Sequence, residues 1–280
     1  MSVAVCTRDR AETLDRCLTS MGRLRVPSGV EWELLVVDNG CTDHTPDVLS
    51  RHRVELPLRV AHEPRGGLSH ARNRAVSAAS GDYVLWTDDD AEVDAEWLAA
   101  YCAAFARWPD AVLFGGPIAP HFEGDPPRWL RRSLPWVDKY FAARDFGPEP
   151  LPLALPKRLP YGCNYAIRTR EQRNLSYDPE LGRQAGRLGL SGEETAVMEA
   201  ILTSGERGWW VPDARVSHLI PPQRQTLAHL REHSRGDLVY RVRQVLRSRE
   251  APGLSLLGSC FWAVGLEVAY RIGRILRSGT

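Results

Sequence analysis

The 280-residue sequence predicts an α/β fold, in which a mostly parallel central sheet is flanked by helices and followed by a C-terminal helical extension. Short apolar runs alternate with segments of helical periodicity over the first 118 residues, a pattern typical of strand–helix–strand units. Polar clusters directly follow three of these runs. They therefore lie at the carboxyl ends of predicted strands, which is where parallel sheets bind ligands. The composition (43% hydrophobic, 25% charged) is that of a globular protein, and the length favours one large domain.

The first half predicts its elements in strict alternation. Buried-type apolar runs predict strands at residues 2–7, 32–37, 58–62, 83–86 and 111–116. Apolar residues at helical spacing, such as Leu14, Cys17, Leu18 and Met21 in the first case, predict helices at residues 8–24, 41–52, 68–79 and 95–108. Thr42 or Asp43 is the expected N-cap of the second helix.

The second half is less regular. Residues 117–160 are rich in Pro and Trp, and we expect ordered loops there. A returning strand is predicted at 161–169, a helix at 192–205 and a strand with a turn at 209–220. Two helical segments, 224–249 and 254–277, complete the chain.

The formal net charge of +1 conceals an uneven distribution. Between Arg224 and Arg277 ten arginines face four acids, so this stretch carries +6 and the remainder −5. A globally basic nucleic-acid binder is therefore disfavoured. The six cysteines form no CxxC pair, which leaves a zinc ribbon or a disulfide scaffold without support.

Three adjacent carboxylates, Asp88, Asp89 and Asp90, follow the fourth predicted strand. They repel one another unless a cation lies nearby, and hard divalent cations prefer carboxylate oxygens. The alternative is a solvated turn that caps a helix. His218, after a strand-like run, is a candidate ligand of the same metal, or else a structural histidine.

Other candidate residues lie at comparable positions in the pattern. Asp38 follows the second strand and could accept hydrogen bonds from a base or a ribose, or cap a helix. Arg72 could face a phosphate or a base from its helix, or lie on a solvated face. Glu193 and Glu194 open a late helix, where a carboxylate either complements the helix dipole or removes a hydroxyl proton.

Seven segments, taken together in this order and spacing, resemble glycosyltransferase family 2. They are VAVCTRDRAETLDRCLTSM, ELLVVDNGCTDHT, GGLSHARNRAV, GDYVLWTDDD, LPYGCNYAIR, SGEETAVMEAIL and VPDARVSHLIPPQR, and they cover residues 3 to about 225. The resemblance implies a GT-A, Rossmann-like fold and an inverting, metal-dependent transfer of a sugar from a nucleotide-sugar donor. It divides the chain into a transferase domain at 1–223, with a nucleotide-binding half (1–118) and an acceptor-side half (119–223), and a basic extension at 224–280.

The resemblance also implies roles for single residues. Thr7 and Asp9 match the nucleotide pocket after the first strand, Asp38 the acid that contacts the base, and Arg72 the Arg of the family's RN motif. Asp88 and Asp90 match the outer residues of the DxD motif, with Asp89 between them, and Asp90 would hold Mg²⁺ or Mn²⁺. Glu194 matches the general base, although the family more often has Asp there, so Glu193 stays an alternative.

Two other functions are weighed against this one. A sugar-1-phosphate nucleotidyltransferase should carry a Gly-rich loop after the first strand, and CTRDRAETL has no Gly. A non-catalytic nucleotide- or sugar-binding protein would not need the acidic triplet and the GEE helix together. The acceptor could be a glycan, a lipid-linked glycan or a small molecule, while nucleic acid is not expected.

The N-terminal residues suggest where the protein is located, and the C-terminal residues suggest what it contacts. No signal segment precedes the first strand, so we expect a cytoplasmic enzyme. Residues 254–266 are uncharged but too short for a confident membrane span. With three arginines beyond, this tail could contact the inner face of the membrane peripherally, pack on the domain or form a homodimer.

Overall fold

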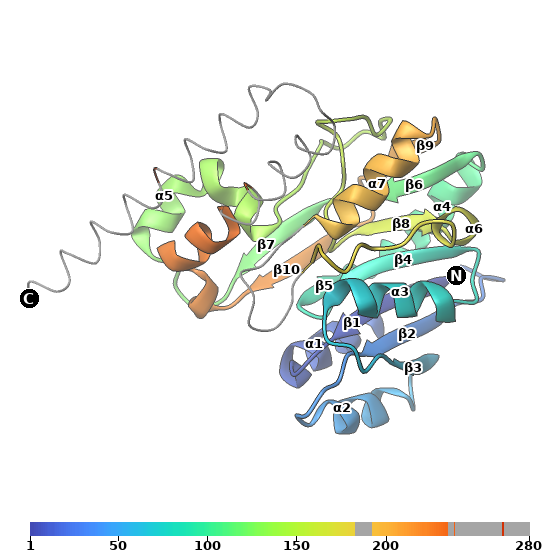
Figure 1. Cartoon of the computed structure of the whole chain (residues 1–280), viewed down its shortest axis with the longest axis horizontal. Coiled ribbons are helices and arrows are strands. Elements are labelled where there is room, and N and C mark those ends of the chain that lie inside the picture. Colours follow the sequence, from blue (N-terminus) through green and yellow to red (C-terminus); the bar gives the residue numbers. More distant parts are fainter. Residues whose placement is uncertain (183–191, 235–237, 239–264, 266–280) are drawn as a thin grey trace, which may run out of the picture.

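The structure is a computed structural model that describes residues 1–182, 192–234, 238 and 265. A seven-stranded sheet forms its centre, in the order β3-β2-β1-β4-β8-β6-β9, and a three-stranded sheet, β5-β10-β7, lies beside it (Figure 1). The strands are β1 (Ser2–Thr7), β2 (Glu33–Asp38), β3 (Leu58–His62), β4 (Tyr83–Asp88), β5 (Ala91–Val93), β6 (Ala111–Gly115), β7 (Ile118–Phe122), β8 (Tyr165–Arg168), β9 (Arg207–Trp210) and β10 (Val216–Ile220).

Helices cover both faces of the large sheet, because successive strand side chains point to opposite sides. Val3 and Val5 belong to a core formed with α1, α2 and α4, whereas Ala4 belongs to a second core formed with α3 and α7. The helices are α1 (Ala11–Met21), α2 (Thr45–His52), α3 (Leu68–Ala78), α4 (Trp97–Arg107), α5 (Arg128–Val137), α6 (Thr169–Gln172) and α7 (Glu193–Thr203), with short 3-10 turns η1 (Asp138–Phe141) and η2 (Pro222–Arg224). The predicted α/β class is confirmed.

The strand register gathers the polar strand ends at one edge. β1 pairs in parallel with β2 and β4, so Thr7 lies opposite Asp38 and Cys6 opposite Asp88. The three predicted polar clusters therefore share the carboxyl edge of the sheet, as parallel strands require. β8 runs antiparallel between β4 and β6, which makes the sheet mixed.

Residues 117–160 contain more regular structure than we expected. β7 and α5 lie within this stretch, and α5 buries Leu130 and Val137 against Phe141 and Ile220. Prolines concealed both elements in the sequence: Pro120 lies inside β7, Pro127 precedes α5 and Pro135 lies in its last turn. The segment 209–220 also differs, because its two strands, β9 and β10, belong to different sheets.

The second helix begins later than predicted. Thr45 is its first residue and His44 its N-cap, so neither Thr42 nor Asp43 occupies that position. Asp43 contributes from just outside, since one carboxylate oxygen accepts from the Thr45 amide (3.1 Å) and the other from the Ala11 amide (3.0 Å). One side chain thereby fixes the starts of both α1 and α2.

The predicted C-terminal helices lie largely outside the described residues. Residues 227–234 are helical and contribute Leu230 to the small core with α5. Within the part of the chain that the structure describes, no helix is both long and apolar enough to cross a bilayer.

A buried carboxylate at the start of β2 makes the fold sensitive to acid. Burial alone would raise the pKa of Glu33, but hydrogen bonds from Ser2 and Ser80 and the Arg59 guanidinium lower it to about 2. The Ser2 hydroxyl donates to Glu33 at 2.6 Å, and the Ser80 amide and hydroxyl donate at 2.7 and 2.6 Å. The carboxylate thus joins the first residue of β1 to the turn before β4.

Glu33→Gln is expected to make the free energy of unfolding less dependent on pH. Because the folded pKa is depressed, the stabilisation is present above the unfolded value of about 4.5 and is lost as the pH falls toward 2. The size is on the order of 2–3 kcal/mol at neutral pH. Urea unfolding of both proteins at pH 7 and pH 3 measures it, and an equal loss of stability with acid in both would contradict the assignment.

Candidate functional site

Arg72 brings together acids from two distant parts of the chain. Its Nη1 donates to Glu193 Oε1 at 2.7 Å and lies 3.5 Å from Glu194 Oε2, while its Nη2 lies 3.6 Å from Asp88 Oδ1. The side chain is buried, and its guanidinium carbon lies 5.9 and 5.6 Å from the ring centres of Trp86 and Tyr177. The carboxyl end of β4 and the start of α7 therefore meet on one guanidinium.

The two adjacent glutamates at the start of α7 have different surroundings. Glu193 is buried with Arg72, and the loop at Gly182 passes closely beside it. Glu194 is more exposed, with 16% of its side-chain surface accessible. A Cβ on Gly162 would lie 2.9 Å from Arg72 and 3.3 Å from the Glu194 carboxyl group, so a glycine is needed beside the pair. Of the two acids, Glu194 is the one that a substrate can reach more readily.

Arg72→Ala is expected to lower the free energy of unfolding by about 3–5 kcal/mol, because it leaves the buried Glu193 carboxylate without its guanidinium. Arg207→Ala is the matched control. Arg207 pairs with Asp110 at 3.0 Å, but both side chains are more than two thirds exposed, and such pairs contribute about 0–1 kcal/mol. Urea unfolding of the two variants measures the difference, and losses of equal size would contradict the structural role of Arg72.

The middle aspartate of the triplet points back into the protein. Asp89 Oδ2 accepts from the Thr7 hydroxyl at 2.8 Å, and Oδ1 accepts from Arg10 Nη1 at 2.6 Å. Burial, together with the neighbouring Asp90, raises the pKa of Asp89 above its usual range despite the nearby Arg10. Asp89 therefore links the end of β1 to the end of β4.

Asp90 is surrounded by cationic groups. Its Oδ2 accepts from Arg10 Nη2 and Arg224 Nη1, each at 2.7 Å, and lies 3.4 Å from His218 Nε2. Although burial alone would raise the pKa of Asp90, His218 and the two arginines hold it well below its usual range. Sequence reasoning singled out His218 but not Arg10 or Arg224, which lie in two of the quoted motifs.

The ring of His218 is oriented by a main-chain group. Its Nδ1 lies 2.9 Å from the Phe141 carbonyl oxygen, which can only accept, so Nδ1 carries a proton, and Nε2 faces Asp90. Burial would lower the pKa of His218, but Asp90 raises it. This arrangement is the one by which proteins orient a metal-binding imidazole.

The remaining predicted residues lie around the ends of β1 and β2. Asp38 accepts from the Cys41 amide at 2.8 Å and lies 3.2 Å from His62 Nδ1. Asp9 has a positive φ of 51° and accepts from the Thr42 amide at 2.6 Å. Donor atoms of Asp9, Cys41 and Asp43 lie within 4.8 Å of one another; those of Asp88, Asp90 and His218 do not form such a group in the described structure.

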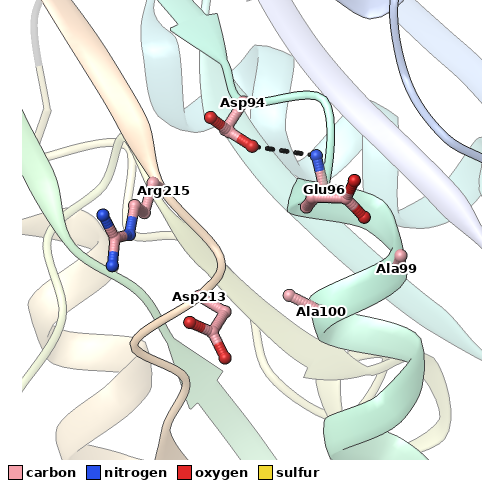
Figure 2. Close-up of a pocket in the computed structure, with 6 residues that line it drawn as sticks. All are labelled: Asp94, Glu96, Ala99, Ala100, Asp213 and Arg215. Carbon is pink, nitrogen blue, oxygen red and sulfur yellow. Dashed lines mark hydrogen bonds between the residues drawn. The ribbon is translucent and has the colours of Figure 1, made fainter. Parts of the chain in front are cut away.

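A separate pocket lies beside the start of α4 and the residues that precede β10. It is lined by Asp94, Glu96, Ala99, Ala100, Asp213 and Arg215, and the Glu96 amide donates to Asp94 within it at 2.9 Å (Figure 2). None of the predicted site residues lines it.

Comparison with known proteins identifies the family. The family model described as glycosyl transferase family 2 matches residues 2–164. The chain is 29% identical over 236 residues to the succinoglycan biosynthesis protein ExoM of Rhizobium meliloti, covering 82% of this chain and 70% of that protein. It is 26% identical over 226 residues to a glucosyl-dolichyl phosphate glucuronosyltransferase of Haloferax volcanii, covering 78% and 68%.

Solved structures of low sequence identity share the fold. A mannosyltransferase from Pyrobaculum calidifontis, in complex with GDP-Man and Mn²⁺, superposes with a TM-score of 0.63 at 21% identity, covering 96% of this chain and 72% of that one. The TarS fragment 1–349 of S. aureus, in complex with UDP-GlcNAc, gives 0.61 at 19% identity, covering 86% and 66%. The family and the fold expected from the seven motifs are confirmed. The chain belongs to glycosyl transferase family 2, has the GT-A fold and is a glycosyltransferase.

Proposed function

We propose that the protein is a metal-dependent, inverting glycosyltransferase that moves a sugar from a nucleotide-sugar donor to a hydroxyl group of its acceptor. The observation that carries this proposal is the convergence on Arg72 of Asp88 from β4 and Glu194 from α7. Asp88, at the end of a strand, is suited to the donor, and Glu194, at the start of a helix, is suited to proton removal. Both acids lie beside the guanidinium group of Arg72.

The donor nucleotide is proposed to bind at the carboxyl ends of β1, β2 and β4. Asp38 and Asp9 provide acceptors for the base and ribose, and Thr7 lies opposite Asp38 at the end of β1. Asp88, with about a third of its side chain exposed, is positioned for the ribose or the cation. Asp89 is assigned a supporting role, because its side chain is only 4% exposed and its two oxygens accept from Thr7 and Arg10.

Asp90 and His218 supply a pair of donor atoms suited to a divalent cation. A carboxylate and an imidazole present Oδ2 and Nε2 only 3.4 Å apart, and the Phe141 carbonyl fixes the imidazole in the ligating orientation. Asp90 and His218 would hold Mg²⁺ or Mn²⁺, with Asp88 as a third candidate. When bound, the cation would offset the charge that develops on the departing nucleotide diphosphate. The mannosyltransferase that shares the fold was solved with GDP-Man and Mn²⁺.

Glu194 is proposed as the general base. Its carboxylate accepts the proton of the acceptor hydroxyl while the oxygen of that hydroxyl forms a bond to the anomeric carbon. The bond between the anomeric carbon and the phosphate oxygen breaks, and its electron pair leaves with the diphosphate. One displacement of this kind inverts the anomeric configuration. Glu193 accepts a hydrogen bond from Arg72 and is proposed to hold the guanidinium group in place.

The acceptor is proposed to be a growing glycan or a lipid-linked glycan, with a small molecule as the alternative. The names of two relatives support this proposal, since one concerns succinoglycan biosynthesis and the other a dolichyl phosphate-linked sugar. The half of the domain at 119–223 would receive the acceptor. Peripheral membrane contact or a homodimer through the tail belongs to the same proposal.

Nucleotide release from a panel of UDP-, GDP- and dTDP-sugars, with and without EDTA, tests the function. We expect release of the nucleoside diphosphate from one class of donor with Mn²⁺ or Mg²⁺, and its loss with EDTA. Release of pyrophosphate from a nucleoside triphosphate and a sugar 1-phosphate would instead support the nucleotidyltransferase alternative. Binding without any turnover of donor, in the presence of a broad set of acceptors, would support the non-catalytic one.

A further inference from the structure

The carboxylate oxygen that the proposed cation needs is already occupied by two guanidinium groups. Asp90 Oδ2 accepts from Arg10 and from Arg224, each at 2.7 Å, and the Asp90 side chain is only 4% exposed. His218 Nε2 approaches the same oxygen at 3.4 Å. A divalent cation on this oxygen would lie within a few ångströms of both guanidinium groups, and like charges at that distance repel strongly in a buried site.

The two arginines are held differently. Arg10 also donates to Asp89 Oδ1 at 2.6 Å, and Asp89 is itself held by Thr7, so Arg10 keeps a partner if Asp90 is taken. In the part of the chain that the structure describes, Arg224 forms an ion pair with Asp90 alone. Arg224 is therefore the group that an incoming cation would release.

The main chain beside Arg224 is fixed while its side chain is long. The next residue, Gln225, is buried and donates to the carbonyl oxygens of Glu123 (2.8 Å) and Ile220 (2.9 Å). These bonds anchor the turn after β10, the strand that also carries His218. The Arg224 guanidinium can therefore change partners by side-chain rotation, without movement of the strand.

We propose that Arg224 occupies the cation-binding oxygen of Asp90 in the donor-free enzyme and transfers to the donor's diphosphate when cation and nucleotide enter together. This inference rests on the proposed function. A guanidinium suits phosphate oxygens through paired hydrogen bonds, so the exchange replaces one charged partner with another. Asp90 receives the cation, and Arg224 receives the phosphate charge that accompanies it.

The exchange makes the binding of cation and nucleotide interdependent. Without the nucleotide, the cation has to displace Arg224 and leaves that guanidinium without a counter-charge. With the nucleotide, the diphosphate supplies the counter-charge. The cation should therefore bind weakly alone and more tightly with a nucleoside diphosphate. Thermodynamic linkage requires the cation to tighten nucleotide binding by the same factor.

Mn²⁺ binding to the full chain, followed by the electron paramagnetic resonance signal of free Mn²⁺, tests the exchange. Titrations are made with Mn²⁺ alone and with UDP or GDP present, and corrected for Mn²⁺ bound by free nucleotide. In the wild type we expect whichever of UDP and GDP binds more tightly to increase the affinity for Mn²⁺ by about tenfold or more. Arg224→Gln should bind Mn²⁺ alone several-fold more tightly, bind the nucleotide more weakly and lose most of the coupling.

Arg215→Gln is the matched control, because Arg215 precedes β10 and lies in the separate pocket of Figure 2. It should behave as the wild type. Arg224→Lys, which keeps the charge but not the paired donors, should lie between the wild type and Arg224→Gln, and it serves if the glutamine variant unfolds.

The outcomes separate this inference from the proposed function. If the nucleotide tightens Mn²⁺ binding equally in the wild type and in Arg224→Gln, and Mn²⁺ alone binds both equally, the exchange is wrong although the metal site stands. If the wild type binds no Mn²⁺ with either nucleotide, both the exchange and the metal dependence are wrong.

Discussion

Glu194→Gln is expected to lower kcat by about 10² or more and to leave the affinity for the donor nucleotide nearly unchanged. The amide keeps the size of the side chain but cannot accept the acceptor's proton, and general base catalysis contributes about 10²–10⁴-fold. Glu194 is the more exposed of the two acids and lies 3.5 Å from Arg72, so its replacement leaves the closer pair of Arg72 with Glu193 intact. Steady-state kinetics and nucleotide titrations measure both effects.

Glu193→Gln is the informative comparison, since it changes the neighbouring residue in the same way. Its carboxylate is buried against Arg72 at 2.7 Å, so the expected loss is chiefly in stability and in the placement of Arg72. If Glu193→Gln folds as stably as the wild type but loses about 10² or more in kcat, Glu193 is the base. Full turnover in Glu194→Gln would also contradict the assignment.

Asp90→Asn is expected to reduce metal-dependent transfer by about 10³ or more. The amide removes the anionic oxygen proposed to hold the cation, and stabilisation of charge in the transition state is typically the largest contribution to a rate. It also leaves Arg10, Arg224 and His218 without their shared counter-charge. Donor turnover as a function of Mn²⁺ concentration measures the loss.

Asp94→Asn is the control for this substitution. Asp94 lies four residues further along the chain, in the separate pocket, and its carboxylate accepts from the Glu96 amide. We expect its turnover and its dependence on Mn²⁺ to match the wild type. Undiminished activity of Asp90→Asn, or of the wild type in excess EDTA, would contradict the metal assignment.

The sequence predicts the first half of the fold well because each element there carries a clear local signal. Val3 and Val5 fall on one face of β1 and Ala4 on the other, so both faces are buried and the strand reads as a continuous apolar run. Once four such strands are parallel, the register places Thr7 opposite Asp38 and Cys6 opposite Asp88. The common edge of the polar clusters follows from that pattern.

The later elements depend on contacts that the local sequence does not contain. α5 is stabilised by Leu130 and Val137 packing on Phe141 and Ile220, a core assembled from distant segments, while Pro135 interrupts its local pattern. β9 and β10 are close in sequence yet belong to different sheets, because β9 pairs with β6 and β10 with β7.

The partners of the site residues could not be predicted for the same reason. The sequence makes His218 a candidate ligand of the same metal as Asp90, and the structure places His218 Nε2 3.4 Å from Asp90 Oδ2. No local rule indicates that Arg10 and Arg224, 214 positions apart, converge on one oxygen of Asp90. Their arrangement depends on β10 lying beside β5, which directly follows Asp90.

The placement of the donor's diphosphate at the carboxyl ends of β1, β2 and β4 can be tested most directly by diffraction. Crystals grown with Mn²⁺ and the nucleoside diphosphate that the protein binds would locate the ion by its anomalous scattering. We expect one strong peak in contact with Asp90 Oδ2, His218 Nε2 and the diphosphate. A bound diphosphate with the peak elsewhere, for example between Asp9, Cys41 and Asp43, would contradict the proposed site.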